Sequence, residues 1–281
     1  MYFTNFNYEN VFCDTYSIFH DSYRIFNRYI LLEVVEIIWI TGDTHGGWIH
    51  RLNMDSFPEQ REMTKDDYVI VLGDFGIWRD SPQQRWYLNW LEEKHFTTLF
   101  IDGNHENYDI LDSYPVEEWH GGKVHFIKPS IIHLMRGQVF EIDDLKFFTF
   151  GGAASHDISD GVLEIDDPRV KEWRDDPDKM YRINHISWWE REMPNQEEMD
   201  EGIKNLAEHD NKVDFILTHC TASSTAALLS HGLYKPDKLT NYLEEVRCNV
   251  DYRKNIFGHY HQNLAVSDKD ICLYEQIIRV N

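Results

Sequence analysis

Residues 100–109 read FIDGNHENYD, so Asn104 and His105 stand side by side directly after an apolar run and a glycine. Both side chains are able to ligate a metal and to form hydrogen bonds. Polar side chains of the same kinds follow four other short apolar runs: Asp43 and His45 in GDTHG, Asp74 in GDFG, His219 after VDFILT, and His259 and His261 in GHYH.

The types and spacing of these side chains predict a metal site. Two aspartates, four histidines and one asparagine form a mixed oxygen and nitrogen set without sulfur, which suits Mn, Fe, Zn, Co or Ni. The set is too large for one ion and divides into two half-shells that share one bridging carboxylate. A single histidine or aspartate beside a glycine is more often a structural group than a ligand. Five complementary motifs, each directly after a strand-like run, instead predict a dinuclear centre.

The elements that must position these groups alternate between strands and helices. Short apolar runs at 37–40, 68–72 and 98–101 have the length and composition of strands buried on both faces. The segment 81–94 between the last two is a predicted helix, with Ser81 as N-cap, Pro82 at its first position and Gln84 completing a capping box. Ligands in open α/β sheets bind at the carboxyl ends of the strands, where every one of these polar groups lies.

The remainder of the chain predicts further strands around an acidic, tryptophan-bearing insertion at about 158–200. Asp143 and Asp144 form a predicted turn, and Asn195 a predicted helix cap. The predicted strands cover 123–127, 131–135, 138–142, 145–150, 213–218, 255–257, 263–266 and 271–276. One predicted helix begins after Asn195, and another covers 236–247. No repeat or low-complexity linker divides residues 35–281, which we expect to form one domain.

Residues 1–34 differ from this domain. They are rich in Tyr, Phe and Asn and show neither a helical nor a strand period. We interpret them as an N-terminal extension of unknown role, or as upstream sequence included by a wrong choice of start codon.

Composition restricts the partners. The formal charge of −22 repels the phosphate backbone of long nucleic acids, although bound metal ions would reverse the sign locally for a small phosphorylated substrate. Four cysteines without a C-x-x-C pair argue against a zinc ribbon or a disulfide framework and indicate a reducing cytoplasm. The longest apolar stretch, at 29–40, is too short to span a membrane and contains Glu33 and Glu36. The oligomeric state is not predicted.

The motifs D-x-H, G-D-x-G, G-N-H-E, T-H and G-H-x-H, in this order, resemble those of the calcineurin-like metallophosphoesterase superfamily, over about residues 36–275. The bacterial and phage members with GDTHG and GNHE motifs are the most similar group. The resemblance implies a four-layer α/β/β/α sandwich with two mixed sheets. It also implies two metal ions, Mn foremost. Asp43, His45 and His261 would bind one ion, Asn104, His219 and His259 would bind the other, and Asp74 would bridge them.

The resemblance gives His105 the role of general acid, pointing past the metals toward the substrate. A hydroxide that bridges the metals would attack phosphorus in line, and His105 would protonate the departing oxygen. A well-placed general acid contributes about 100- to 10,000-fold.

One departure concerns the G-D-x-x-D-R-G motif of the phosphoprotein phosphatases. Here the stretch is GDFGIWRD, so Ile77 and Trp78 replace the Asp and Arg. Protein phosphatase activity is therefore less expected. Arg79 is a candidate phosphate ligand, with an exposed loop arginine as the alternative.

Other candidates lie in and beside the insertion. His156 in FGGAASHD is a candidate substrate ligand, with an ordinary turn as the alternative. Trp188 and Trp189 are candidates for stacking on a base or sugar, or for core packing. Cys220 is interpreted as a packing residue.

Two functional hypotheses follow. The first is a metal-dependent phosphoesterase that acts on a monoester, a diester or a nucleotide, with a nuclease or cyclic-nucleotide phosphodiesterase as the runner-up of the same class. The second is a non-catalytic scaffold of this fold that binds partner proteins. Because every expected position is filled, including His105, the enzyme is favoured.

Overall fold

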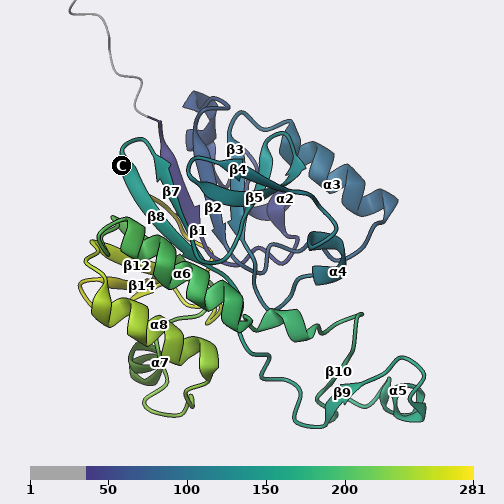
Figure 1. Ribbon diagram of the computed structural model, residues 1–281. Helices are drawn as coiled ribbons and strands as arrows, with labels where there is room; N and C mark the ends of the chain where they lie inside the picture. The colour runs from purple at the N-terminus through teal and green to yellow at the C-terminus, as the bar shows by residue number, and fades with distance from the viewer. Residues whose placement is uncertain (1–35) are drawn as a thin grey trace, which may run out of the picture. The chain divides into compact units, whose positions relative to one another are not determined.

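The apolar runs form two mixed β-sheets in the computed structural model, which describes residues 36–281 (Figure 1). The extension predicted over residues 1–34 lies outside the described residues. The first sheet has the order β15-β1-β2-β3-β6-β5-β4 and the second β13-β14-β12-β11-β8-β7. The strands of the first sheet are β1 (Ile38–Thr41), β2 (Tyr68–Leu72), β3 (Thr97–Ile101), β4 (Val116–Trp119), β5 (Gly122–Lys128), β6 (Ile131–Leu134) and β15 (Ile277–Arg279). Those of the second are β7 (Gln138–Ile142), β8 (Leu145–Phe150), β11 (Phe215–Thr218), β12 (Lys254–Phe257), β13 (Leu264–Ala265) and β14 (Asp270–Cys272).

The centre of each sheet is parallel. Strands β1, β2, β3 and β6 run in one direction, as do β8, β11, β12 and β14, whereas the outer pairs are antiparallel. The carboxyl ends of neighbouring parallel strands therefore meet at one edge of each sheet.

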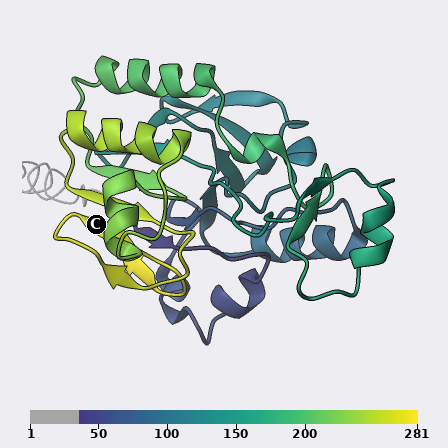
Figure 2. The ribbon, with the colours of Figure 1, turned by 90° about the horizontal axis from the view of Figure 1, so that it is seen from below.

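Helices cover the outer faces of the two sheets (Figures 1 and 2). The bounds are α2 (Trp48–Arg51), η1 (Pro58–Glu62), α3 (Pro82–Glu92) and α4 (Tyr108–Leu111) beside the first sheet, and α6 (Gln196–Glu208), α7 (Ser223–Leu229) and α8 (Lys238–Asn249) beside the second. Ser81 and Asn195 cap their helices as predicted. The prediction for Gln84 is wrong, because its side-chain oxygen accepts the N–H groups of Trp78 and Arg79 instead.

Side-chain alternation along the strands explains the layers. In β2, Ile70 and Leu72 join a buried cluster shared by both sheets, whereas Val69 and Val71 join a second cluster with Leu88 and other helical residues. A third cluster lies between the second sheet and helices α6 and α8. Three apolar interfaces separate four layers, so the α/β/β/α sandwich expected from the sequence is confirmed.

The strand predictions need correction near the C-terminus, where β15 was not predicted, and at the edge formed by β4. The strand predicted at 271–276 is interrupted, because the Asn263 side-chain oxygen accepts the N–H groups of Tyr274 and Gln276 between β14 and β15. Strand β4 was not predicted. Three of its four residues are exposed, so it lacks the apolar run on which the predictions rested.

The insertion forms its own small unit of β9 (Gly161–Leu163), α5 (Pro168–Trp173), β10 (Tyr181–Ile183) and η2 (Glu190–Glu192). Strands β9 and β10 pair in parallel, apart from both large sheets (Figure 1). Trp189 anchors the insertion to helix α4, since it is buried and its indole N–H donates to Asp109 Oδ2 at 2.8 Å. This supports core packing for Trp189 rather than stacking on a ligand.

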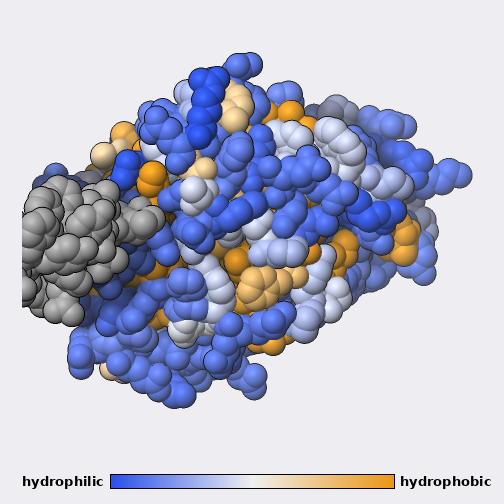
Figure 3. Space-filling model, turned by 90° about the horizontal axis from the view of Figure 1, so that it is seen from above, coloured by the Kyte–Doolittle hydropathy of each residue, from blue (hydrophilic) through white to orange (hydrophobic). Residues whose placement is uncertain are grey.

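The face seen in Figure 3 is mostly hydrophilic, and its hydrophobic residues form small separate groups. Among the described residues, no helix combines the length and apolar character that crossing a membrane requires.

Candidate metal centre

Every candidate ligand of the sequence lies just beyond the carboxyl end of a parallel strand. The first sheet supplies Asp43 and His45 after β1, Asp74 after β2, and Asn104 and His105 after β3. The second sheet supplies His219 after β11, and His259 and His261 after β12. The structure brings these side chains together where the strand ends of the two sheets meet.

One group consists of Asp43, His45 and His261. The Nε2 atoms of the two histidines are 3.1 Å apart, and His261 Nε2 lies 3.2 Å from Asp43 Oδ2. Asp43 Oδ2 is buried and accepts no hydrogen bond from the described residues. A buried carboxylate oxygen without a donor, facing two imidazole nitrogens, is suited to a divalent cation.

A second group consists of Asp43, Asp74 and His219. His219 Nε2 lies 3.4 Å from Asp74 Oδ1 and 3.2 Å from Asn104 Oδ1. The other oxygen of Asp74, Oδ2, lies 3.8 Å from His45 Nε2 in the first group. Asp74 therefore faces both groups with different oxygens. His259 belongs to neither group of ligand atoms, although its ring centroid is only 5.0 Å from that of His219.

Hydrogen bonds outside the cluster fix the orientation of its members. His219 Nδ1 donates to the Leu72 carbonyl at 2.8 Å, which leaves Nε2 free for a cation. Asn104 Nδ2 donates to Ser155 Oγ at 3.4 Å, so Oδ1 faces His219. Glu192 in turn accepts both the N–H and the hydroxyl of Ser155, at 2.8 and 2.6 Å.

The glycines of the motifs permit close approach. A Cβ on Gly103 would lie 2.1 Å from Asp74 Oδ1, and one on Gly258 would lie 2.2 Å from Asp43 Oδ1. Any larger residue at Gly103 or Gly258 would therefore overlap the carboxylate of Asp74 or Asp43.

Four candidate ligands adopt left-handed backbone conformations, which non-glycine residues rarely occupy: His45 (φ 46°), Asp74 (φ 43°), His259 (φ 65°) and His261 (φ 50°). Such conformations cost on the order of 1–3 kcal/mol each and are concentrated at functional sites. The strain is offset by the surrounding fold and aims the side chains at the cluster.

Electrostatics favour an ionised Asp43 and neutral rings of His45 and His259. Burial opposes ionisation of Asp43, but the nearby His219 and His261 rings and the hydrogen bond from the His259 N–H outweigh it and lower the pKa to about 2. Burial lowers the pKa of His45, and it lowers that of His259 well below the ordinary value. The adjacent carboxylate of Asp43, 3.2 Å away, raises the pKa of His261. Ionised carboxylates and neutral imidazoles are the forms that bind metals.

His105 lies at the edge of the cluster. Its backbone N–H donates to Asp74 Oδ1 at 2.8 Å, and its ring centroid is 5.6 Å from that of His45. Its ring is nearly parallel to that of Trp78, at 10° with centroids 6.3 Å apart. Burial lowers the pKa of His105.

The two candidate substrate ligands lie near different members of the cluster, Arg79 near His45 and His156 near His259. Arg79 lines a pocket of about 290 Å³ that also includes His45. His156 stacks on Tyr234 at a centroid distance of 5.8 Å, and its ring lies 5.5 Å from that of His259. Cys220 is buried in the cluster under α6 and α8, in agreement with a packing role.

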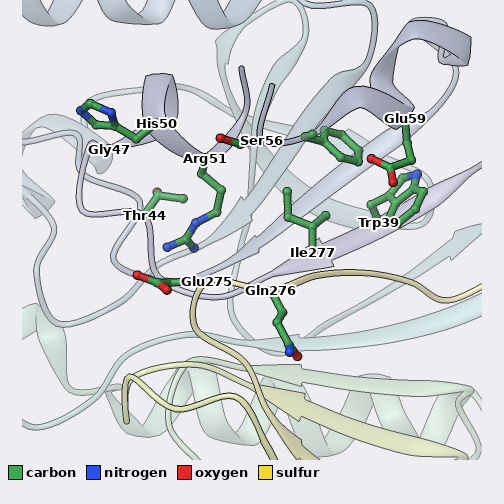
Figure 4. A pocket seen from close by; sticks show the side chains of 11 residues that line it. Trp39, Thr44, Gly47, His50, Arg51, Ser56, Glu59, Glu275, Gln276 and Ile277 are labelled. Atoms are coloured by element: carbon green, nitrogen blue, oxygen red, sulfur yellow. The ribbon is translucent and has the colours of Figure 1, made fainter. Parts of the chain in front are cut away.

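A larger cavity of about 540 Å³ lies beside α2, and its lining contains none of the candidate ligands (Figure 4). Arg51, which lines it, donates through Nη1 to the carbonyls of Gly42 and Tyr274, at 3.1 and 2.6 Å. The Tyr274 ring stacks on His261 with centroids 4.5 Å apart. Arg51 thus holds the loop that contains Asp43 and the Tyr274 backbone next to His261.

The sequence analysis did not identify Glu106 and Glu192, two buried carboxylates near the cluster. Glu106, in the same GNHE motif as Asn104, accepts the N–H groups of Phe75 and Gly76 and so holds the loop after Asp74. Burial, together with the charge of Asp74, raises its pKa well above the ordinary value. Its position in the motif could have drawn attention to it. Glu192 lies far along the chain in the insertion, where no local pattern distinguishes it.

Comparison with known proteins agrees with this geometry. A sequence model of the calcineurin-like phosphoesterase family matches residues 37–263. The chain therefore belongs to the calcineurin-like phosphoesterases, and the resemblance seen in its motifs is confirmed.

Comparison with individual proteins adds little to the family assignment. Among solved structures, the phosphopantetheinyl hydrolase of Mycobacterium tuberculosis is similar at 15% identity and a TM-score of 0.43, covering 87% of this chain and 95% of that one. A search of curated proteins found no match.

Proposed function

We propose that this chain hydrolyses a phosphate ester with two divalent cations, manganese foremost, held where the two sheets meet. Asp43, His45 and His261 would hold one cation, Asn104, His219 and His259 would hold the other, and Asp74 would serve both. The observation that carries this assignment is the position of Asp74. Its Oδ2 lies 3.8 Å from His45 and its Oδ1 lies 3.4 Å from His219, so its two oxygens would be available to different cations.

The cations, when bound, supply Lewis acidity and a source of activated water. The protein residues orient the ester and move the proton. His105 is held against Asp74 by its backbone N–H and carries the ring proton that the departing alcohol oxygen takes up. Arg79 binds the ester from the pocket beside His45, and His156 contacts it from the side of His259.

The test uses protein stripped of metal and reloaded with Mn²⁺. Turnover of an aryl phosphomonoester and an aryl phosphodiester is measured for the wild type, for His105→Ala and for the control His95→Ala. His95 is exposed and precedes the amino end of β3, at the opposite edge of the sheet. We expect metal-dependent turnover that falls at least about tenfold in His105→Ala and is unchanged in His95→Ala.

Inactivity of the wild type on both esters, despite two bound cations, would favour the scaffold that binds partner proteins. A marked preference for the diester would favour the nuclease or cyclic-nucleotide phosphodiesterase. We still predict that the protein is located in a reducing cytoplasm. Among the described residues, Cys220, Cys248 and Cys272 are free thiols, as such a location would allow.

A further inference from the structure

The pocket of about 290 Å³ beside the metal cluster has an unusual lining. It begins at His45 and continues over the aromatic rings of Trp48, Trp78 and Tyr87. Gln83, Gln84 and Arg79 add amide and guanidinium groups. Aromatic surface combined with a few polar groups is the composition of sites that bind small organic molecules.

Trp78 is the part of this lining that is most difficult to explain by folding alone. It is 43% exposed, although a tryptophan gains stability mainly by burial. The backbone N–H of Trp78 donates to Gln84 Oε1 at 3.1 Å, and its backbone carbonyl accepts a hydrogen bond from Asn107 Nδ2 at 2.9 Å. Because its backbone is already fixed, an exposed aromatic residue at this position needs less ordering when it binds a ligand.

The position of Trp78 relates it to the proposed reaction. Its ring is nearly parallel to that of His105, at a centroid distance of 6.3 Å. An alcohol that takes its proton from His105 therefore leaves beside the face of Trp78. Arg79, the next residue, places a positive charge in the same pocket.

We infer that this pocket binds the alcohol portion of the ester and that this portion carries a planar heteroaromatic ring, as a nucleoside does. Stacking on an aromatic side chain accepts any base, and the neighbouring amides provide partners for the ring edge. The inference rests on the proposed function for its chemistry, but ring binding requires no turnover and is measurable separately.

The experiment measures binding of adenosine and of ribose to the full chain loaded with Mn²⁺, by calorimetry. Trp78→Leu keeps apolar bulk but removes the aromatic face, and Trp78→Phe restores a ring. Trp86→Ala is the matched control, because Trp86 is 56% exposed and does not line the pocket.

We expect the wild type to bind adenosine and not ribose. Trp78→Leu should weaken adenosine binding roughly 5- to 150-fold, the range of base stacking. Trp78→Phe should recover most of the affinity, and Trp86→Ala should change it less than about twofold. Absence of adenosine binding to the wild type, equal binding of ribose and adenosine, or adenosine binding that Trp78→Leu leaves intact would overturn the inference. These binding results do not bear on the proposed function, which is tested separately by hydrolysis of the two aryl esters.

Discussion

At the scale of single residues, the orientation of the Asn104 amide depends on a chain of buried hydrogen bonds. Glu192 fixes Ser155, and the Ser155 hydroxyl oxygen accepts a hydrogen bond from Asn104 Nδ2, so that the amide oxygen is turned toward His219. Partners of metal ligands typically contribute about 10- to 100-fold to metal affinity. Glu192 belongs to the insertion, so the insertion influences the metal centre through this contact.

We predict that Ser155→Ala lowers the affinity for one of two Mn²⁺ ions by about 10- to 100-fold, because the amide loses the partner that sets its orientation. Calorimetric titration of the metal-free protein measures both affinities. Ser113→Ala is the control, since it removes an exposed hydroxyl that donates to the Ile110 carbonyl away from the cluster. Unchanged affinity for both ions in Ser155→Ala would exclude this role.

At the scale of secondary-structure elements, one buried ion pair joins the end of β3 to the β6–β7 connection. Arg136 Nε donates to Asp102 Oδ2 at 2.8 Å, and Arg136 Nη2 donates to the Arg191 carbonyl of the insertion at 2.9 Å. Arg136 holds the pKa of Asp102 well below its ordinary value, against the effect of burial.

Replacing Arg136 with Leu should therefore destabilise the fold by about 3–5 kcal/mol, because the buried Asp102 would lose its guanidinium partner and keep only the contacts with Tyr108 and His133. Urea unfolding measures the loss. The double variant Arg136→Leu, Asp102→Leu should recover much of it. As a control, Arg85→Leu breaks the exposed pair with Asp80 and should cost less than about 1 kcal/mol. If the double variant is no more stable than the single one, lost packing rather than the unpaired charge is responsible.

Strands β5 and β6 place two buried histidines opposite each other. The Nδ1 atoms of His125 and His133 are 3.1 Å apart, so one ring donates and the other accepts. Burial, with a smaller contribution from His133, lowers the pKa of His125 from 6.5 to about 4.

A lowered histidine pKa means that the unfolded chain binds this proton more readily than the folded one. Stability should therefore fall as the pH decreases from about 6.5 toward about 4. Chemical unfolding at about pH 7 and about pH 5 should show a smaller difference for His125→Asn than for the wild type, and no such change for the exposed control His95→Asn. An equal difference in all three proteins would show that His125 does not contribute.

The same elements show what the sequence could predict. Runs such as YVIVL at 68–72 are buried at every position, so composition alone indicates a strand, and the polar residues after each run mark the site. Strand β4 has no such pattern, because most of its residues are exposed. The break between β14 and β15 depends on the side chain of Asn263, which accepts the N–H of Tyr274 from 11 residues away. The contact of Glu192 with Ser155 spans 37 residues, and no local period encodes it.

At the scale of the whole molecule, the metal cluster connects the two sheets. Asp43, His45, Asp74 and Asn104 come from the first sheet, and His219, His259 and His261 from the second. Without cations, two buried carboxylates and several imidazoles face each other at this junction. Cation binding should therefore stabilise the complete sandwich, since ligands on both sheets are released only when the sheets separate.

We predict that Mn²⁺ raises the thermal stability of the protein. At a free concentration of about 100 times Kd, one site contributes about 2.7 kcal/mol to the free energy of unfolding. Asp74→Asn should lose most of this gain, because the shared carboxylate no longer carries a charge for either cation. The metal-free variant should be at least as stable as the metal-free wild type, since one of two neighbouring buried carboxylates is neutralised. Asp66→Asn, at an exposed position, is the control. A Mn²⁺-induced shift of equal size in Asp74→Asn and the wild type would place the cations elsewhere.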